Sequence, residues 1–322
     1  MQGSVFESNY LMKTLQQLAQ SEIIFEEPWK IEKPNSWIEH IPFAFYLVEQ
    51  LKPAKVVELG VHSGNSYNAF CQAVKHLELN TRCYGIDHWK GDDHAGFYGD
   101  QIFKELKKYQ DENYQDFSTL MRMSFDEAKE NFEEGSIDLL HIDGLHTYES
   151  VRHDYENWKP KLSKRAVVLF HDTCVREHNF GVWKLWDELK RDNEHFEFFH
   201  GHGLGVLFSS ADRAKKIVPS GSENIVLFRK IFELAGGEIF SEFALKDLNE
   251  RINSVTRQND LLKNENREVL YHLSRTENIF EEMKGYKNHL EKVVNSISWK
   301  VGRAITFPLR ALHSVFSGSK KK

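Results

Sequence analysis

The chain has 322 residues and a formal net charge of −6, and 40% of its residues are hydrophobic and 28% charged. With 23 Phe, 11 Tyr and 7 Trp it can bury a large core, which excludes wholesale disorder, and its length suggests about two domains. The last seven bases follow Glu291, after which no acid remains, so residues 1–291 hold 35 bases against 48 acids. The acidic body disfavours nucleic acid as a partner, whereas the basic tail favours an anionic surface.

Compartment signals point to a cytoplasmic protein. No apolar run approaches the roughly 18 residues of a membrane-spanning helix. The first ten residues, MQGSVFESNY, lack the basic start and apolar stretch of a signal peptide, which disfavours export by that route. The three cysteines, Cys71, Cys83 and Cys174, lie outside any CxxC spacing, so neither a disulfide framework nor a cysteine zinc site is indicated.

Residues 1–218 alternate short apolar runs with amphipathic stretches. Each run is rich in Val, Ile or Leu and ends in Gly or a carboxylate, as buried parallel strands do: 55–60, 82–87, 137–143 and 166–172. Helical patterns at 65–77 and 99–109 lie between them, and the Gly-rich turn within 196–208 predicts an antiparallel pair at one edge. With a weaker strand near 117–121, we predict an α/β fold: a Rossmann-like, seven-stranded doubly wound sheet with an antiparallel last strand.

A second kind of sequence pattern, a heptad repeat, begins after a junction at 219–243. From Leu245, steps of three and four residues reach Ile297 with twelve of sixteen positions apolar, which predicts a coiled coil over 244–297 and favours a parallel homo-oligomer. Asn259 and Asn266 fall at equivalent positions of the repeat. The alternative is a helix packed on the preceding domain. Residues 298–322 form a basic amphipathic tail that suits peripheral contact with a membrane, or else frays or docks on a partner protein.

A ligand loop is indicated at 56–66, VVELGVHSGNS, where a strand runs into a helix. Gly60 lets the chain turn sharply and lets the backbone approach a ligand, and Gly64 leaves room at the helix start. The spacing is not GxGxxG, which disfavours a dinucleotide; an ordinary strand–helix turn is the alternative. Asp87 closes the next strand 27 residues after Gly60, where α/β nucleotide sites bind ribose hydroxyls, unless it only caps the strand.

Four stretches together resemble class I S-adenosylmethionine-dependent methyltransferases: Glu58-x-Gly60, GIDHWKGDDHAGFYG (85–99), HIDGLHTYESVRHD (141–154) and LFHDT (169–173). The resemblance covers roughly residues 37–210 and is closest to the branch of sugar O-methyltransferases of macrolide and surface-polysaccharide pathways. It implies S-adenosylmethionine across the first two strands and a divalent metal, Mg²⁺ or Mn²⁺, beside the acceptor. By position, Glu58, Gly60 and Gly64 would border the methionine part, Asp87 would bind the ribose diol and Ser124 would lie near the adenine.

The resemblance also places the two candidate catalytic residues, Asp143 and His146, above the sheet. Asp143 follows the fourth strand and His171 and Asp172 follow the fifth, and these three would be the metal ligands. The imidazole of His171 suits Mn²⁺, Fe²⁺ or Zn²⁺ better than Mg²⁺, which remains plausible if only the two carboxylates bind. His146, three residues after Asp143, is the candidate general base because its unperturbed pKa of ~6.5 fits the task, and a purely hydrogen-bonding role is the alternative.

His94 and Tyr98 are the expected acceptor contacts. The resemblance implies an O-methyltransferase for a sugar hydroxyl, in an O-antigen-like bacterial surface glycan. With the basic tail, it places the enzyme at the inner membrane face, where a glycosyltransferase is a possible partner. One alternative is a coiled-coil scaffold that recruits glycan-assembly enzymes and keeps a non-catalytic head. Another is a metal-dependent hydroxylase-like enzyme.

Overall fold

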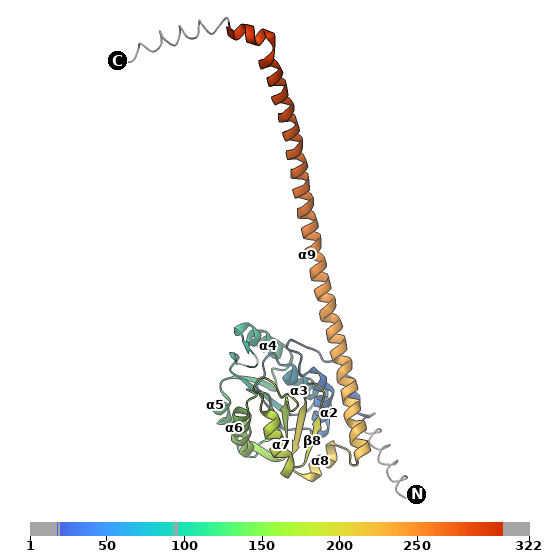
Figure 1. Ribbon diagram of the computed structural model, residues 1–322. Helices are drawn as coiled ribbons and strands as arrows, with labels where there is room; N and C mark the ends of the chain where they lie inside the picture. The colour runs from blue at the N-terminus through green and yellow to red at the C-terminus, as the bar shows by residue number, and fades with distance from the viewer. Residues whose placement is uncertain (1–17, 19, 93, 95, 305–322) are drawn as a thin grey trace, which may run out of the picture. The chain divides into compact units, whose positions relative to one another are not determined.

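The computed structural model describes residues 18, 20–92, 94 and 96–304, and divides the chain into two compact units, Met1–Lys246 and Asp247–Lys322 (Figure 1). The first unit is built on a seven-stranded sheet. Its strands, in chain order, are β1 (Lys55–Leu59), β2 (Arg82–Asp87), β5 (Ser118–Arg122), β6 (Ile137–Ile142), β7 (Leu162–His171), β8 (His195–Phe198) and β9 (Leu204–Phe208). A separate two-stranded sheet joins β3 (Gly91–Asp92) to β4 (Gly96–Phe97).

The strand order is β5-β2-β1-β6-β7-β9-β8. The first five of these strands run parallel, and β9 pairs antiparallel with both β7 and β8. The predicted Rossmann-like, doubly wound sheet with an antiparallel last strand is therefore confirmed. Strand β6 is buried at every position, as expected where helices cover both faces of a parallel sheet.

Helices pack on both faces of the sheet. One face carries α2 (Ile41–Leu51), α3 (Asn65–His76), α4 (Asp100–Asn113) and α8 (Ala211–Ile217), whose apolar residues join one core cluster. The other face carries α5 (Phe125–Lys129), α6 (Tyr148–Trp158) and α7 (Val182–Asp192) around a second cluster. Short 3-10 turns complete the unit at Glu22–Phe25, Ile38–His40 and Lys159–Lys161.

Helix α9 (Ser222–Asn295) starts inside the segment that the sequence suggested to be a junction. Phe228 and Phe232, one helical turn apart, are buried against Phe43 and Tyr46 of α2, with ring centroids 5.4–5.6 Å apart. At Gly236 the helix comes so close to the chain before α2 that an added Cβ would lie 1.9 Å from the carbonyl oxygen of Glu39. The first turns of α9 are thus part of the core of the first unit.

In the second unit, α9 continues to Asn295, and every residue from 248 to 295 is exposed. Helical structure resumes after a bend at Ser296 and is described as far as residue 304. Most of the predicted basic tail, residues 305–322, lies outside the described residues. Within the described part of the chain, no helix combines the length and the apolar character needed to cross a bilayer.

We expect Phe232→Ala to lower the free energy of unfolding of the first unit by roughly 3–5 kcal/mol, because it leaves a cavity between α9 and α2. Phe240→Ala is the matched control, since Phe240 lies in the same helix but is 40% exposed; a change of about 0.5 kcal/mol is expected there. Urea unfolding of the full chain measures both. Equal effects would contradict the packing of α9 against α2.

Candidate active site

A cleft of about 600 Å³ opens at the carboxyl ends of the parallel strands. It lies where the sheet topology switches, because the chain runs from β1 to β2 and β5 on one side and then returns to β6 on the other. Ligands of open α/β sheets bind at such a switch point. Residues from the loops after β1, β2, β5 and β6, and from α5 and α6, line the cleft.

The floor of the cleft is a contact between two backbone segments. Gly60, with φ +90°, follows β1, and a Cβ on it would lie 2.1 Å from the carbonyl oxygen of Asp143. The amide of Asp143 in turn donates to the carbonyl of Leu59 at 2.8 Å. Gly64 also has φ +90° but faces away from the cleft, since an added Cβ would meet Leu106 at 2.6 Å. The predicted glycine pair therefore divides into a cleft residue and a packing residue.

Asp87 lines the cleft and shapes the glycine loop. One carboxylate oxygen accepts hydrogen bonds from the backbone amides of Val61 and His62, both at 3.0 Å, and the other accepts from the amide of Trp89 at 2.6 Å. Only 7% of Asp87 is exposed, at the position predicted for the ribose-binding acid. Three backbone donors thus fix the orientation of this carboxylate.

Glu58 is fully buried and is not among the residues that line the cleft; its predicted place beside the methionine part of the cofactor stays a prediction. Its buried carboxylate accepts the Ser66 hydroxyl at 2.6 Å and lies 3.4 Å from Nδ1 of His141. The indole N–H of Trp37 donates to Nε2 of His141 at 3.1 Å, so Nδ1 carries the proton that faces Glu58. Burial raises the pKa of the Glu58 carboxyl, and His141 opposes that rise. Glu58 supports the floor from below.

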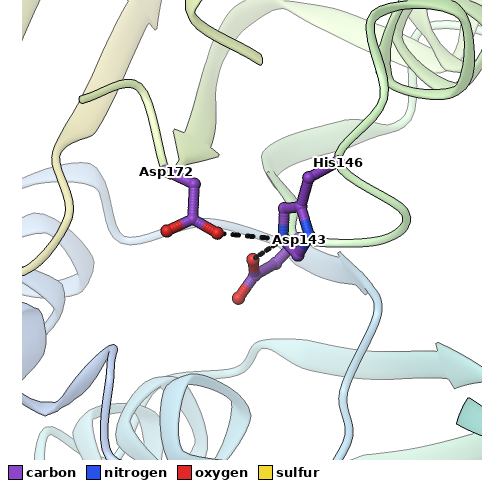
Figure 2. A group of neighbouring side chains, drawn as sticks. All are labelled: Asp143, His146 and Asp172. Atoms are coloured by element: carbon purple, nitrogen blue, oxygen red, sulfur yellow. Dashed lines mark hydrogen bonds and ion pairs between the residues drawn. The ribbon is translucent and has the colours of Figure 1, made fainter. Parts of the chain in front are cut away.

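Asp143, His146 and Asp172 meet above the sheet (Figure 2). Nε2 of His146 lies 3.2 Å from a carboxylate oxygen of Asp143 and 3.0 Å from one of Asp172. One ligand atom from each residue lies within 4.8 Å of the others, a spacing that could hold a metal ion. Asp172 follows β7 with φ +63°, a left-handed conformation that Asp tolerates and that is common at functional sites.

The two carboxylates are kept ionised by the imidazoles around them. Burial raises the pKa of the Asp143 carboxyl, but His171 and His146 outweigh it, and the pKa lies well below its ordinary value. Burial disfavours charge on His146 as well, yet its contacts with Asp143 and Asp172 raise its pKa. Nδ1 of His146 is buried and has no hydrogen-bond partner among the described residues. Nε2 of this imidazole is thus held by the two carboxylates, and Nδ1 is the nitrogen left to accept a proton.

His171 is buried beside both carboxylates, with its Nδ1 3.5 Å from Asp172, and its predicted role as a metal ligand stays a prediction. Its Nδ1 lies 3.2 Å from Asp143, its Nε2 lies 3.1 Å from the carbonyl oxygen of Gly201, and 2% of it is exposed. Burial opposes its charged form, but Asp172 and Asp143 raise its pKa to about 9. With both nitrogens engaged, His171 orients Asp143, and the two carboxylates favour its charged form. The group able to hold a metal contains His146 in its place.

The predicted acceptor residues lie near His146. His94 stacks on Phe180 with ring centroids 4.5 Å apart, and Phe180 stacks on His146 at 4.7 Å. Tyr98 lines the cleft and packs against His62, with the two ring centroids 4.4 Å apart. Phe180 precedes α7 and was missed by the sequence reasoning, because one aromatic residue in a loop gives no signal of its own.

Ser124, the residue expected to lie near the adenine, is among the residues that line the cleft. It is the N-cap of α5, and its hydroxyl accepts the amide of Glu127 while the Glu127 carboxylate accepts from Ser124 in a capping box. The S-x-x-E pattern of the sequence explains this arrangement. The predicted adenine contact stays a prediction.

Asp154 is a further cleft residue, which the sequence analysis did not select as a site residue. It lies on α6 against Gly144, is 7% exposed, and its carboxyl group has no hydrogen-bond partner within the described residues. Burial is the main cause that raises its pKa to about 7. Its oxygens are not among the fully buried side-chain atoms, so this carboxyl group faces the cleft. A signal was present, because Asp154 shares helical spacing with the buried Val151, Tyr155 and Trp158.

We expect Asp154→Asn to stabilise the protein at pH 8 and to have little effect near pH 4. The folded state keeps this proton up to pH about 7 and the unfolded state loses it near 3.8, so wild-type stability falls as pH rises between those values. The gain is at most about 4 kcal/mol. Thermal unfolding across this pH range measures it, with Asp111→Asn on the exposed face of α4 as control. A pH-independent difference would contradict the burial of an unpaired carboxyl.

Comparison with known proteins identifies the segment that builds this cleft. Residues 57–173 match the family model described as "Methyltransferase domain". An uncharacterized protein, y4gI, of Sinorhizobium fredii is 47% identical over 193 residues, which are 60% of this chain and 21% of that protein. The chain therefore spans about a fifth of the length of this relative.

Solved structures with similar folds include three from different organisms. S-adenosylhomocysteine-bound PaMTH1 of Podospora anserina has a TM-score of 0.42 at 12% identity, covering 65% of this chain and 95% of that one. A Geobacter sulfurreducens methyltransferase has a TM-score of 0.39 at 16% identity, covering 64% of this chain and 94% of that one. Spermidine synthase of Thermotoga maritima has a TM-score of 0.40 at 14% identity, covering 56% of this chain and 62% of that one. At these values the likeness carries no argument on activity. The methyltransferase domain match at 57–173 is the comparison that bears on the site.

Proposed function

We propose that the first unit transfers a methyl group from S-adenosylmethionine to a hydroxyl group of a sugar. The observation that carries this proposal is the placement of His146 between Asp143 and Asp172, at the switch point of the sheet and within the segment that matches a methyltransferase domain. Methyl transfer to oxygen needs a positioned proton acceptor and an aligned acceptor hydroxyl, and this arrangement can supply both.

The cleft suits S-adenosylmethionine in size and chemistry. Its volume of about 600 Å³ lies in the usual range for small-molecule sites. Gly60 lines the cleft and offers its backbone to a ligand, and the oriented carboxylate of Asp87 suits a ribose diol. Ser124 and Phe125 line the end where a base would lie, and Asp154 could receive an amino group there. When bound, the cofactor supplies an electrophilic methyl group.

The acceptor proton would pass to Nδ1 of His146. The two carboxylates hold Nε2 and favour the protonated imidazole, which makes His146 a stronger base than an exposed histidine. If a divalent ion is bound instead, Asp143, Asp172 and Nε2 of His146 would hold it, and His146, with its proton then on Nδ1, would be a ligand rather than the base. Oδ1 of Asp172 also lies 3.3 Å from Nδ1 of His202 and 3.5 Å from Nδ1 of His171. Such an ion supplies Lewis acidity that lowers the pKa of a bound hydroxyl.

A sugar acceptor is supported by the residues at the mouth of the cleft. The rings of His94, Phe180 and Tyr98 offer apolar faces beside polar groups, a combination that suits a sugar ring. The basic character of residues 298–322 supports a lipid-linked glycan at the inner membrane face as the acceptor, and a glycosyltransferase that builds it as a neighbour.

We expect the full chain to bind S-adenosylmethionine with micromolar affinity and Asp87→Ala to weaken binding by at least about tenfold, because the variant loses both the ribose partner and the anchor of the glycine loop. Isothermal titration calorimetry measures both. Asp111→Ala, which changes an exposed acid on α4, should bind as the wild type does. Absence of binding to the folded wild-type chain would remove the methyltransferase proposal and favour a non-catalytic head.

We also expect methyl transfer to be lost on chelation and restored better by Mn²⁺ than by Mg²⁺, because the donor set includes an imidazole nitrogen. Release of S-adenosylhomocysteine measures the rate. Asp172→Asn should keep cofactor binding and lose the restoration. Full activity with chelator present would exclude metal assistance and leave His146 as the direct base, in which case His146→Gln should lower the rate by about 10²–10⁴.

A further inference from the structure

We propose that residues 245–294 of α9 pair with the same residues of a second copy of this chain in a parallel, in-register, two-stranded coiled coil. This inference does not depend on the proposed reaction. Every residue from 248 to 295 is exposed in the single chain, although many are large and apolar. Such surfaces mark interaction sites.

The apolar residues form one continuous stripe. With Leu245 at position a of a heptad, eleven of the fifteen a and d positions up to Val294 are apolar, and these eleven are 41–67% exposed. On the opposite side, Leu261 is the single apolar residue among the fourteen b and c positions from 246 to 289. A stripe that repeats every 3.5 residues at the a and d positions is the surface that packs against a second helix in a coiled coil. Here it runs along about 75 Å of helix, at 1.5 Å per residue.

The polar core residues argue for an identical partner in register. Asn259 and Asn266 both occupy a positions, where in a parallel pair each faces its own copy and the two amides can hydrogen-bond. A shift of one heptad would leave only one Asn–Asn pair. In an antiparallel pair the a positions face d positions, and Thr276 is the only polar d residue in this stretch. Only the parallel, in-register pair satisfies both amides.

The flanking positions do not oppose this arrangement. In a parallel pair each g residue meets the e residue five positions later in the partner. Among these pairs no like charges meet, and His272 faces Glu277. Lys287 occupies an a position, where two strands let its long side chain reach water more easily than three do. Two chains are therefore favoured over three.

The mass of the full chain in solution tests the pairing. Light scattering after size exclusion should give twice the chain mass of 37.7 kDa. Leu262→Glu with Leu273→Glu should give single chains, since both leucines lie in the stripe and Glu preserves helix. Leu261→Glu with Tyr271→Glu, at c and f positions of equal exposure, should remain paired. A single-chain mass for the wild type, a mass of three or more chains, or equal effects of the two double variants would overturn the proposal.

Cross-linking tests the orientation. Asn266→Cys in a Cys174→Ser background, where Cys71 and Cys83 are buried, should form an inter-chain disulfide on mild oxidation with diamide. Asn288→Cys, at a b position, should not. A paired protein that fails to cross-link through residue 266, or that cross-links equally through residue 288, would overturn the parallel, in-register arrangement.

Discussion

Two carboxylates at the ends of neighbouring parallel strands, and the imidazoles that hold them ionised, are the interaction on which the site depends. Asp143 follows β6 and Asp172 follows β7, and burial alone would drive both towards their neutral acids. His171 beneath them and His146 above them supply the opposing charge. Because His171 also donates to the carbonyl of Gly201, the charge cluster is anchored to the turn between β8 and β9. The antiparallel edge of the sheet therefore contributes to the site.

Sheet topology then determines what can lie beside this cluster. Since β1 and β6 are neighbours, the loop at Gly60 comes against Asp143, and the absence of a side chain at residue 60 is what permits it. Asp87 fixes the same loop from β2 with three backbone amides. A ligand placed between Asp87 and His146 would thus contact a rigid floor, which is the condition for aligning a displacement reaction.

Much of the fold was predictable because buried parallel strands carry a strong signal. The apolar runs at 55–60, 82–87 and 137–143 match β1, β2 and β6 closely. The two-residue strands β3 and β4 have no such signal. In the site, strand order predicted that Asp143 and Asp172 would meet. It could not tell which imidazole is more buried, because His171 ends β7 and His146 lies in the loop after β6, and tertiary contacts set the exposure of both side chains. Asp154 was not selected as a site residue although it interrupts an apolar helical face, because an acid on a helix is usually a surface residue.

The contacts beneath the floor show that the physical domain is larger than the segment recognised by similarity. Trp37 and His40 precede residue 57, yet one fixes the tautomer of His141 and the other bonds to the carbonyl that also holds His171. Phe228 and Phe232, well after residue 173, close the core against α2. A fragment cut at the limits of the family match would lack the supports of its own active site. Homologous sequences are therefore better compared over the whole first unit, because a change at residue 37 or 232 can alter the chemistry as surely as one in the cleft.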